Sequence, residues 1–86
     1  MKKWYVYIVE CADGSLYTGI TTSVQRRILE HNYSFKAAKY TRSRRPVRLV
    51  YRKEFANRSE ASKEEARIKR LRRAQKKELI REGQIN

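Results

Sequence analysis

The sequence predicts an α+β fold, with a small three-stranded antiparallel sheet flanked by helices in the order β-β-α-β-α-α. Segments rich in aromatic and β-branched residues alternate with segments whose apolar residues recur at helical spacing. An Asp-Gly turn joins the first two strand candidates directly, as in an antiparallel hairpin. The 86 residues suffice for one domain with one modest core, which we expect over residues 1–82, followed by a short tail over 83–86.

The first two strands are expected to form this hairpin. Residues 4–10 have the sequence WYVYIVE, a composition typical of a strand. Asp13-Gly14 supplies the turn, and residues 16–20 form the returning strand. Gly19 lies inside that second strand, which indicates a bulge or the close approach of another group.

A helix, a loop and a third strand are expected next. Ser23 is a good N-cap for a helix over residues 24–32. Residues 33–46 show little apolar periodicity and many basic side chains, so we predict a long basic loop that ends at Pro46. Residues 47–52 alternate well enough to form the third strand.

Two helices are expected to complete the domain. Asn57 or Ser59 caps the first, in which Ala61 and Ile68 recur at helical spacing. A break near Arg72-Arg73 separates it from a short final helix over residues 75–81, which Gly83 ends.

The charge of the chain favours a polyanionic partner. There are 22 Lys and Arg residues against 9 Asp and Glu residues, which gives a formal net charge of +13. Nucleic acid is the first choice of partner. An acidic membrane surface is a distant second, because the C-terminal helices lack a broad apolar face with Trp or Phe. Charge alone does not separate DNA from RNA, or an enzyme from a ribosomal-type binding protein.

The cysteine content and the apolar segments indicate the compartment. Cys11 is the single cysteine, which excludes an internal disulfide and any zinc site built on several thiolates. No signal peptide is visible, and no segment approaches the ~20 apolar residues of a membrane span. We therefore expect a soluble cytoplasmic protein.

Four features in a fixed order resemble a known family. The triplets Tyr5-Val6-Tyr7 and Tyr17-Thr18-Gly19 are followed by Arg27 in RRILEHN and by Glu65 in EEARIKRL. This set resembles the GIY-YIG nuclease superfamily, and it looks closest to its small single-domain bacterial members, the UPF0213 group. The basic segment over 37–51 is also similar to that group.

The first triplet has Tyr5 where the superfamily usually has glycine, and the second has Thr18 where isoleucine or valine is usual. Gln75 or Lys76 lies where many members of the superfamily carry an asparagine.

The resemblance implies hydrolysis of a phosphodiester by an activated water with one divalent metal ion, Mg²⁺ or Mn²⁺. Glu65 is the implied metal ligand, and Arg27 would grip the scissile phosphate. We give Tyr7, Tyr17 and His31 a shared general-base role. A tyrosine with a pKa near ~10 is hardly ionised at neutral pH, whereas an unperturbed histidine titrates near ~6.5. Tyr7, Tyr17, Arg27, His31 and Glu65 are thus the candidate catalytic residues.

The basic loop is the candidate nucleic-acid interface. Tyr40 and Thr41 lie among its cations, where they could stack on a base or donate to a phosphate. We expect DNA as the main partner, recognised by phosphates and shape in repair or processing, with a targeting protein as a further partner. The candidate contact residues are Lys36, Lys39, Tyr40, Thr41, Arg42, Arg44, Arg45 and Lys76.

Each candidate also has a purely structural interpretation. The tyrosines could be strand packing, Glu65 could only pair with Lys69 one helical turn later, and His31 could be a helix-end residue. A non-catalytic module that binds DNA or RNA is therefore the alternative function, and a ribosome-associated basic protein is a weaker one. The joint presence of two tyrosines, an arginine and a glutamate favours the enzyme, because binding alone does not need a carboxylate near a cationic surface.

Overall fold

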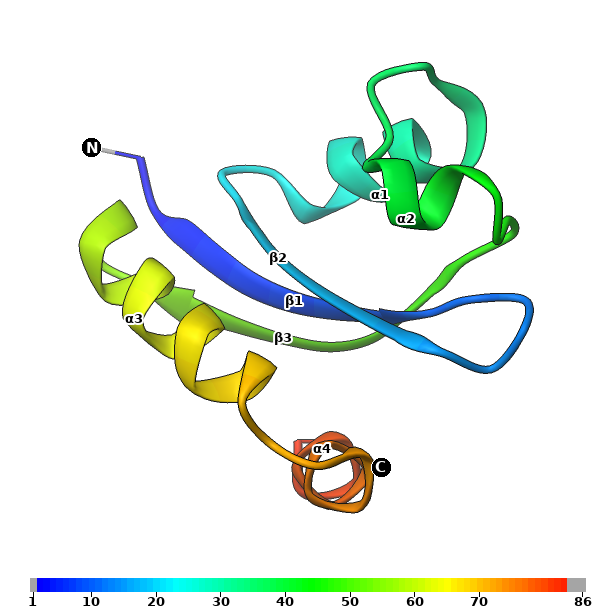
Figure 1. Ribbon diagram of the computed structural model, residues 1–86. Helices are drawn as coiled ribbons and strands as arrows, with labels where there is room; N and C mark the ends of the chain where they lie inside the picture. Colours follow the sequence, from blue (N-terminus) through cyan, green and yellow to red (C-terminus); the bar gives the residue numbers. More distant parts are fainter. Residues whose placement is uncertain (1, 84–86) are drawn as a thin grey trace.

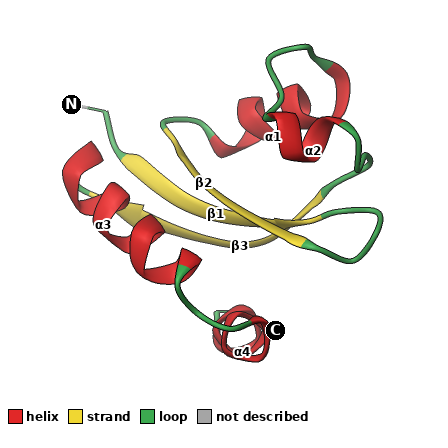
Figure 2. Cartoon of the chain, viewed as in Figure 1, coloured by secondary structure: helices red, strands yellow, loops and turns green. Residues whose placement is uncertain are grey.

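The three strands form one antiparallel sheet with the spatial order β2-β1-β3. The computed structural model, which describes residues 2–83, has β1 (Trp4–Glu10) in the centre between β2 (Leu16–Thr21) and β3 (Arg48–Phe55). Helices cover both faces of this sheet (Figures 1 and 2). This confirms the predicted α+β class and the predicted order of elements, to which the structure adds one short helix before β3, and it explains why the central strand is apolar along most of its length.

The β1–β2 hairpin turns where the sequence predicted. Gly14 has a φ of +83°, a left-handed conformation that glycine adopts without strain. Asp13 supports the turn by accepting hydrogen bonds from the backbone N–H and the hydroxyl of Ser15. The third strand is longer than predicted, because its end pairs with the start of β1, where Trp4 lies opposite Phe55.

One layer of helices consists of α1 (Val24–Tyr33) and α2 (Lys39–Arg42). Ser23 caps α1 as predicted, with its hydroxyl accepting from the backbone N–H of Arg26 at 3.3 Å. The prediction of an unbroken loop over 33–46 is wrong, because α2 forms one short helical turn inside it. Local hydrogen bonds to the carbonyl of Ala38, from the Arg42 N–H and the Thr41 hydroxyl, stabilise that turn.

The second layer consists of α3 (Arg58–Lys69) and α4 (Arg73–Glu82). The Asn57 side chain caps α3 by accepting from the N–H of Glu60 at 2.9 Å, as predicted. The break before α4 lies where it was expected, but α4 begins two residues earlier than predicted. Gly83 follows its end with an ordinary right-handed φ of −82°. Residues 84–86 of the predicted tail lie outside the described residues.

Each face of β1 contributes to a different core. Val6 and Ile8 point toward α3 and α4, where they pack with Ala61, Ile68 and Ile80. The intervening residues of β1 point toward α1 and α2, where the buried cluster consists of Tyr7, Val9, Cys11 and Val47. The alternation of side chains along one strand therefore separates an aliphatic core from one that contains a phenol.

Two sets of long-range hydrogen bonds fix the α1–α2 layer to the sheet. The Asn32 side chain bonds to both the N–H and the carbonyl of Val47, at 2.7 and 3.0 Å. Arg44 binds the Asp13 carboxylate at 3.1 Å, and its own carbonyl accepts from the N–H of Ala12 at 2.9 Å. Within the described residues, no helix is long and apolar enough to cross a membrane.

Candidate active site

A buried hydrogen-bond chain connects the sheet with both helices of the α1–α2 layer. The Tyr7 hydroxyl lies 2.7 Å from Nε2 of His31, and Nδ1 of the same ring lies 2.7 Å from Oγ1 of Thr41. All three residues are buried, with 1% of Tyr7 exposed and none of His31 or Thr41. The chain crosses from β1 through α1 to α2.

The contacts of Thr41, at the outer end of this hydrogen-bond chain, determine where the protons of the three side chains lie. The Thr41 hydroxyl lies 3.0 Å from the carbonyl oxygen of Ala38, which can only accept. Thr41 has one hydroxyl proton and uses it there, so its oxygen accepts from His31, which must carry its proton on Nδ1. Nε2 is then an acceptor, and the Tyr7 hydroxyl donates to it. For a neutral imidazole, no other assignment of protons satisfies all three contacts.

Gly19 provides the space for the phenol. It lies opposite Tyr7 in the β1–β2 register, and a Cβ atom at this position would be only 2.6 Å from the Tyr7 hydroxyl oxygen. The predicted close approach at Gly19 is therefore made by Tyr7 itself. Any larger residue here would push Tyr7 away from His31.

Burial and nearby charge shift the pKa values of this pair in opposite directions. Burial raises the pKa of Tyr7 to about 12, although the hydrogen bond and positive charge of Arg27 lower it; Tyr17 and Glu65 add to the increase. Burial, together with the positive charges of Arg27 and Arg45, lowers the pKa of His31 to about 4. Both groups are neutral at pH 7, so His31 is available there as a proton acceptor.

Arg27 lies between Tyr7 and the segment that follows α1. Its Nη1 donates to Glu30 at 2.9 Å and to the carbonyl of Lys36 at 2.8 Å. The hydrogen bond and charge of Arg27 also lower the pKa of the Glu30 carboxyl. The Arg27 side chain is 23% exposed, so it can reach a ligand at the surface while it remains oriented by these bonds.

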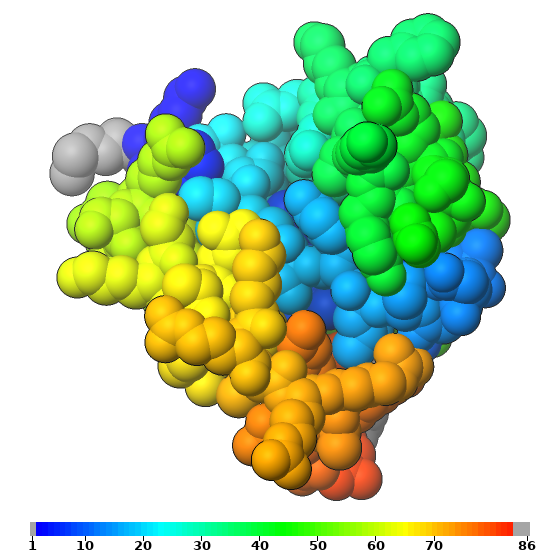
Figure 3. All heavy atoms as spheres, in the orientation of Figure 1, coloured from blue at the N-terminus to red at the C-terminus, as the bar shows by residue number. Residues whose placement is uncertain are grey.

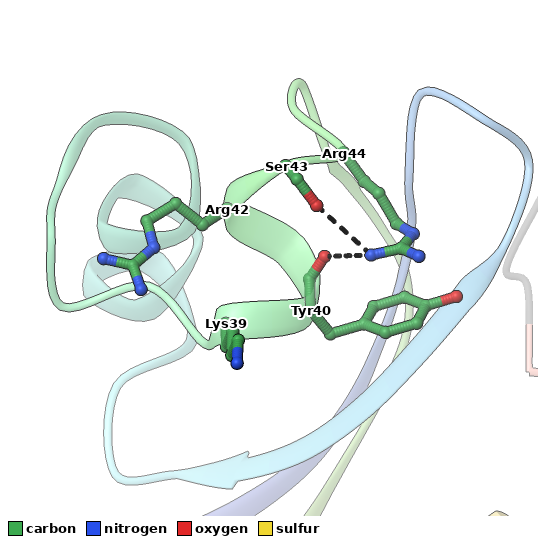
Figure 4. Close-up of a pocket in the computed structure, with 5 residues that line it drawn as sticks. All are labelled: Lys39, Tyr40, Arg42, Ser43 and Arg44. Atoms are coloured by element: carbon green, nitrogen blue, oxygen red, sulfur yellow. Dashed lines mark hydrogen bonds between the residues drawn. The ribbon is translucent and has the colours of Figure 1, made fainter.

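Tyr17, which is only partly buried, lies on the outer side of the Tyr7–His31–Thr41 hydrogen-bond chain. Its ring meets the His31 ring edge-on, with 5.4 Å between centroids, and is stacked with Tyr40 of α2 at 6.1 Å. The Arg44 guanidinium lies 3.8 Å from the centroid of the Tyr40 ring. Figure 4 shows Arg44 alongside Tyr40, while Lys39 points away from that ring.

A shallow groove of about 220 Å³ continues from Tyr17 toward the other helical layer. Tyr17 and Tyr40 line it together with Lys69 and Lys76. Figure 3 shows atoms of β2 between those of α2 and those of the α3–α4 junction on this face. Glu65 adjoins the groove through its ion pair with Lys69, at 3.2 Å. The lining of the groove therefore includes two lysines and two tyrosines, with one carboxylate beside it.

The predicted nucleic-acid contacts fall into two groups. Four cations make no ion pair or side-chain hydrogen bond within residues 2–83 and are free to meet phosphates: Lys36, Lys39, Arg42 and Lys76. Arg44 and Arg45 are instead held internally. Arg44 binds Asp13 and the Tyr40 carbonyl, and Arg45 donates to the carbonyls of His31 and Ser34.

The prediction that Thr41 contacts nucleic acid is wrong. This residue is fully buried, and its hydroxyl is occupied by Ala38 and His31. Sequence reasoning could not find this role, because a threonine among five cations resembles any other polar surface residue. The pairing of Asn32 with Val47 was also missed, since it joins the end of a helix to a residue 15 positions later, just before β3.

The comparisons with known proteins establish the family. The GIY-YIG catalytic domain model matches residues 3–78, which is most of the chain. The chain belongs to the GIY-YIG family. It is 64% identical over 77 residues to a UPF0213 protein of Desulfotalea psychrophila, covering 90% of this chain and 70% of that protein. A UPF0213 protein of Halobacterium salinarum is 55% identical over 76 residues, covering 88% and 97% respectively.

Solved structures agree with this assignment. A solution NMR structure of a UPF0213 protein from Bacillus halodurans has 51% identity and a TM-score of 0.59, and covers 91% of this chain and 82% of its own. The solution NMR structure of a protein from E. faecalis has 43% identity and a TM-score of 0.64, and covers 94% of this chain and 85% of its own. The resemblance inferred from the motifs is therefore confirmed for the GIY-YIG and UPF0213 relationship. The family is one of nucleases, and the UPF0213 names say nothing of an activity.

Proposed function

We propose that this protein is a metal-dependent endonuclease that hydrolyses phosphodiester bonds in nucleic acid, with DNA as its main substrate. The observation that carries the proposal is the directed chain Tyr7–His31–Thr41. Because Tyr7 donates its proton to His31, the lone pairs of its oxygen are left to accept a proton from a water molecule. The site is shallow and open, which suits a polymer, and we expect recognition by structure rather than by base sequence.

In this mechanism Tyr7 and His31 act together as the general base. A water molecule gives a proton to the Tyr7 oxygen, Tyr7 passes its own proton to Nε2 of His31, and the resulting hydroxide attacks phosphorus. Only 1% of Tyr7 is exposed, so Arg27 must shift slightly to admit the water. A pKa of about 4 makes neutral His31 a weak base, so this proton transfer is uphill and forms the His31 imidazolium only transiently.

The remaining residues bind and orient the substrate. Arg27 presents its free edge to the scissile phosphate, and Tyr17 contacts the same phosphate from the outer side. Lys36, Lys39, Arg42 and Lys76 bind neighbouring phosphates, and Tyr40 offers an aromatic edge beside the groove. The leaving oxygen takes its proton from solvent, and His31 returns its own proton to water through Tyr7.

Glu65 would hold the divalent ion. Among residues 2–83 no group of three or more His, Cys, Asp or Glu side chains could enclose a metal, which does not suit a tightly ligated ion such as zinc. A single carboxylate next to a phosphate-binding groove fits Mg²⁺ or Mn²⁺, which keep most of their water and use the substrate phosphate as a further ligand. When bound, the ion would stabilise the charge on the phosphate and the leaving oxygen.

A non-catalytic nucleic-acid-binding module is the alternative, and two ion pairs favour it. Glu65 is paired with Lys69, and Arg27 is paired with Glu30, so a metal ion or a substrate must compete with these ion pairs. A protein that only binds phosphates would keep the cations and the groove without needing the proton relay.

Cleavage assays on nicked, branched and single-stranded DNA and RNA, with Mg²⁺ or Mn²⁺, test the proposal against this alternative. Glu65→Gln should bind the substrates but lose at least about 10²-fold in cleavage rate. Glu64→Gln is the matched control, because Glu64 is the adjacent residue and is likewise paired with a helix cation, Arg67. Equal, metal-independent cleavage by both variants would overturn the assignment, and binding without any cleavage by the native protein would establish the binding module.

A further inference from the structure

The end of α1 and the turn that follows it carry two exposed aromatic side chains. Tyr33 is 82% exposed and Phe35 is 92% exposed, and the α1–α2 segment to which they belong projects at the top of the molecule (Figures 1 and 3). Leu29, one helical turn before Tyr33, is 54% exposed. A single exposed apolar side chain is ordinary, but three between residues 29 and 35 of a small protein indicate a binding surface. We refer to residues 33–36 as the aromatic turn.

The aromatic turn is held rigidly on both sides of Phe35. The Ser34 N–H donates to the Glu30 carbonyl at 3.0 Å, and the Ser34 hydroxyl accepts from the Lys36 N–H at 3.0 Å. The Ser34 carbonyl accepts from the Ala37 N–H and from Arg45. Phe35 is therefore presented on an ordered backbone, so binding through its ring costs little conformational entropy.

The same turn is connected directly to the candidate active site. The carbonyl of Lys36 accepts a hydrogen bond from Arg27 at 2.8 Å. The hydrogen bond and positive charge of Arg27 in turn lower the pKa of the Tyr7 hydroxyl. Phe35 therefore directly precedes Lys36, the residue whose carbonyl contacts Arg27, the proposed phosphate-binding side chain. When a nucleic acid places a phosphate at Arg27, the nucleotides next to that phosphate lie near the aromatic turn.

The chemistry around the turn favours a nucleic-acid base over a protein side chain. Tyr33 and Leu29 form the apolar part of a shallow hollow of about 400 Å³, whose polar part includes Gln25 and Arg26. Lys36 adds a cation that has no partner within residues 2–83. An aromatic platform interleaved with cations is the arrangement by which proteins hold single strands, because bases stack on the rings while phosphates meet the charges.

We propose that Phe35 and Tyr33 stack on an unpaired base next to the scissile phosphate, so that the protein prefers substrates with a single-stranded segment at the cleavage site. This inference rests on the proposed function in that nucleic acid is the ligand. It adds a feature of the substrate, since a fully paired duplex keeps its bases stacked inside and offers none to the turn.

Binding measured without metal tests this inference separately from cleavage. Fluorescence anisotropy would compare a short single-stranded oligodeoxynucleotide with the blunt duplex of the same sequence, for the native protein and for Phe35→Ala. Single-strand affinity should fall about 5- to 150-fold, the range of measured base–aromatic stacking, while duplex affinity changes less than about twofold. Phe35→Trp should retain single-strand binding. Leu49→Ala, another exposed apolar residue, is the matched control and should change neither affinity.

A base analogue gives a direct reading of stacking. The fluorescence of 2-aminopurine in the single strand should be quenched by the native protein and by Phe35→Trp but not by Phe35→Ala. Equal loss of single-strand and duplex affinity, or no loss of either, would overturn the inference, and the second result would leave the turn as a surface for a protein partner. If the stacking inference is overturned but the native protein cleaves with metal and Glu65→Gln does not, the proposed function stands. If the native protein never cleaves but Phe35→Ala loses single-strand binding, the nuclease proposal fails and the stacking site stands.

Discussion

The two faces of β1 carry cores of opposite character. Toward α3 and α4, Val6 and Ile8 pack in an aliphatic cluster with Ile68. Toward α1 and α2, Tyr7 is buried equally well, but its hydroxyl enters a hydrogen-bond chain with His31. The first core can only stabilise the fold, whereas the second holds a neutral proton acceptor at a fixed distance from a phenol. A chain of 86 residues thus combines the two tasks on alternate residues of one strand.

This arrangement has a cost on the polar face. A buried histidine and a buried phenol are stable only while each finds its partner, because an unpaired buried polar group costs about 1–3 kcal/mol. Every buried side-chain nitrogen and oxygen in residues 2–83 does have a partner. The polar core is therefore complete, and removing one member should affect chemistry and stability together, whereas removing an aliphatic residue should affect stability alone.

Tyr7→Phe is expected to have the largest effect and would test the chemical role of the polar face. The substitution removes the oxygen that accepts a proton from water, so the single-turnover cleavage rate should fall by about 10²- to 10⁴-fold. Tyr5→Phe is the matched control, since Tyr5 points to the same face but makes only a 3.4 Å bond with Glu54. A similar loss of rate in both variants would show that the tyrosines act by packing.

Ile8→Ala would test the other half of the comparison. Ile8 is fully buried in the aliphatic core, so its truncation should lower the free energy of unfolding by about 2–5 kcal/mol, measured by urea denaturation. The cleavage rate per folded molecule should not change. Ile68→Val removes one methylene at a buried site and should cost about 0.5–1.5 kcal/mol, which provides a folded variant if Ile8→Ala does not fold. A loss of activity without loss of stability would contradict the separation of the two cores.

Local sequence signals predicted most of the fold. Asp13-Gly14, Ser23 and Asn57 each carry a turn or cap whose chemistry is contained within three or four residues, and each has its predicted role. The motif order also placed Tyr7 and His31 among the candidates, and the structure brings them within 2.7 Å. Short-range chemistry and an ordered set of motifs were therefore sufficient to predict this part of the architecture.

Long-range pairings could not be predicted in the same way. The contact of Thr41 with His31 depends on how the segment between α1 and α2 folds back over the sheet. Arg45 was expected to bind phosphate because it is basic, yet it donates to two backbone carbonyls. Tyr5 and Tyr7 have the same residue type and the same face of β1, and only the tertiary structure makes one partly exposed and the other buried.

Thr41→Val would test whether Thr41 sets the position of the His31 proton. The variant keeps the shape of the side chain but removes the acceptor for the buried Nδ1–H, so the free energy of unfolding should fall by about 1–3 kcal/mol. Thr41→Ser retains the hydroxyl and should behave almost as the native protein does. Because the chain has one histidine, ¹⁵N NMR of the imidazole reports its tautomer without ambiguity. The native protein should show the Nδ1–H form, and the same spectrum in Thr41→Val would contradict the positioning role.

The pH dependence of stability should show the smallest effect, and it isolates the polar face. The pKa of His31 is about 4 in the folded protein, below its usual value of 6.5, so between these values the unfolded chain binds the extra proton. Stability is therefore complete above about pH 6.5 and decreases as the pH falls toward 4. Urea denaturation at pH 7 and pH 5.5 should differ by about 1 kcal/mol.

His31→Gln is the control for this measurement, because it removes the only histidine and should abolish the difference between the two pH values. Carboxylates do not account for it, since ion pairs such as those of Glu30 and Glu64 with arginine lower the pKa of those groups further below this range. The aliphatic core has no group that titrates here, so Ile68→Val should lower stability equally at both pH values. A pH effect that survives in His31→Gln would show that the acid-sensitive group lies elsewhere, and the two faces of β1 would no longer differ in the way that the structure indicates.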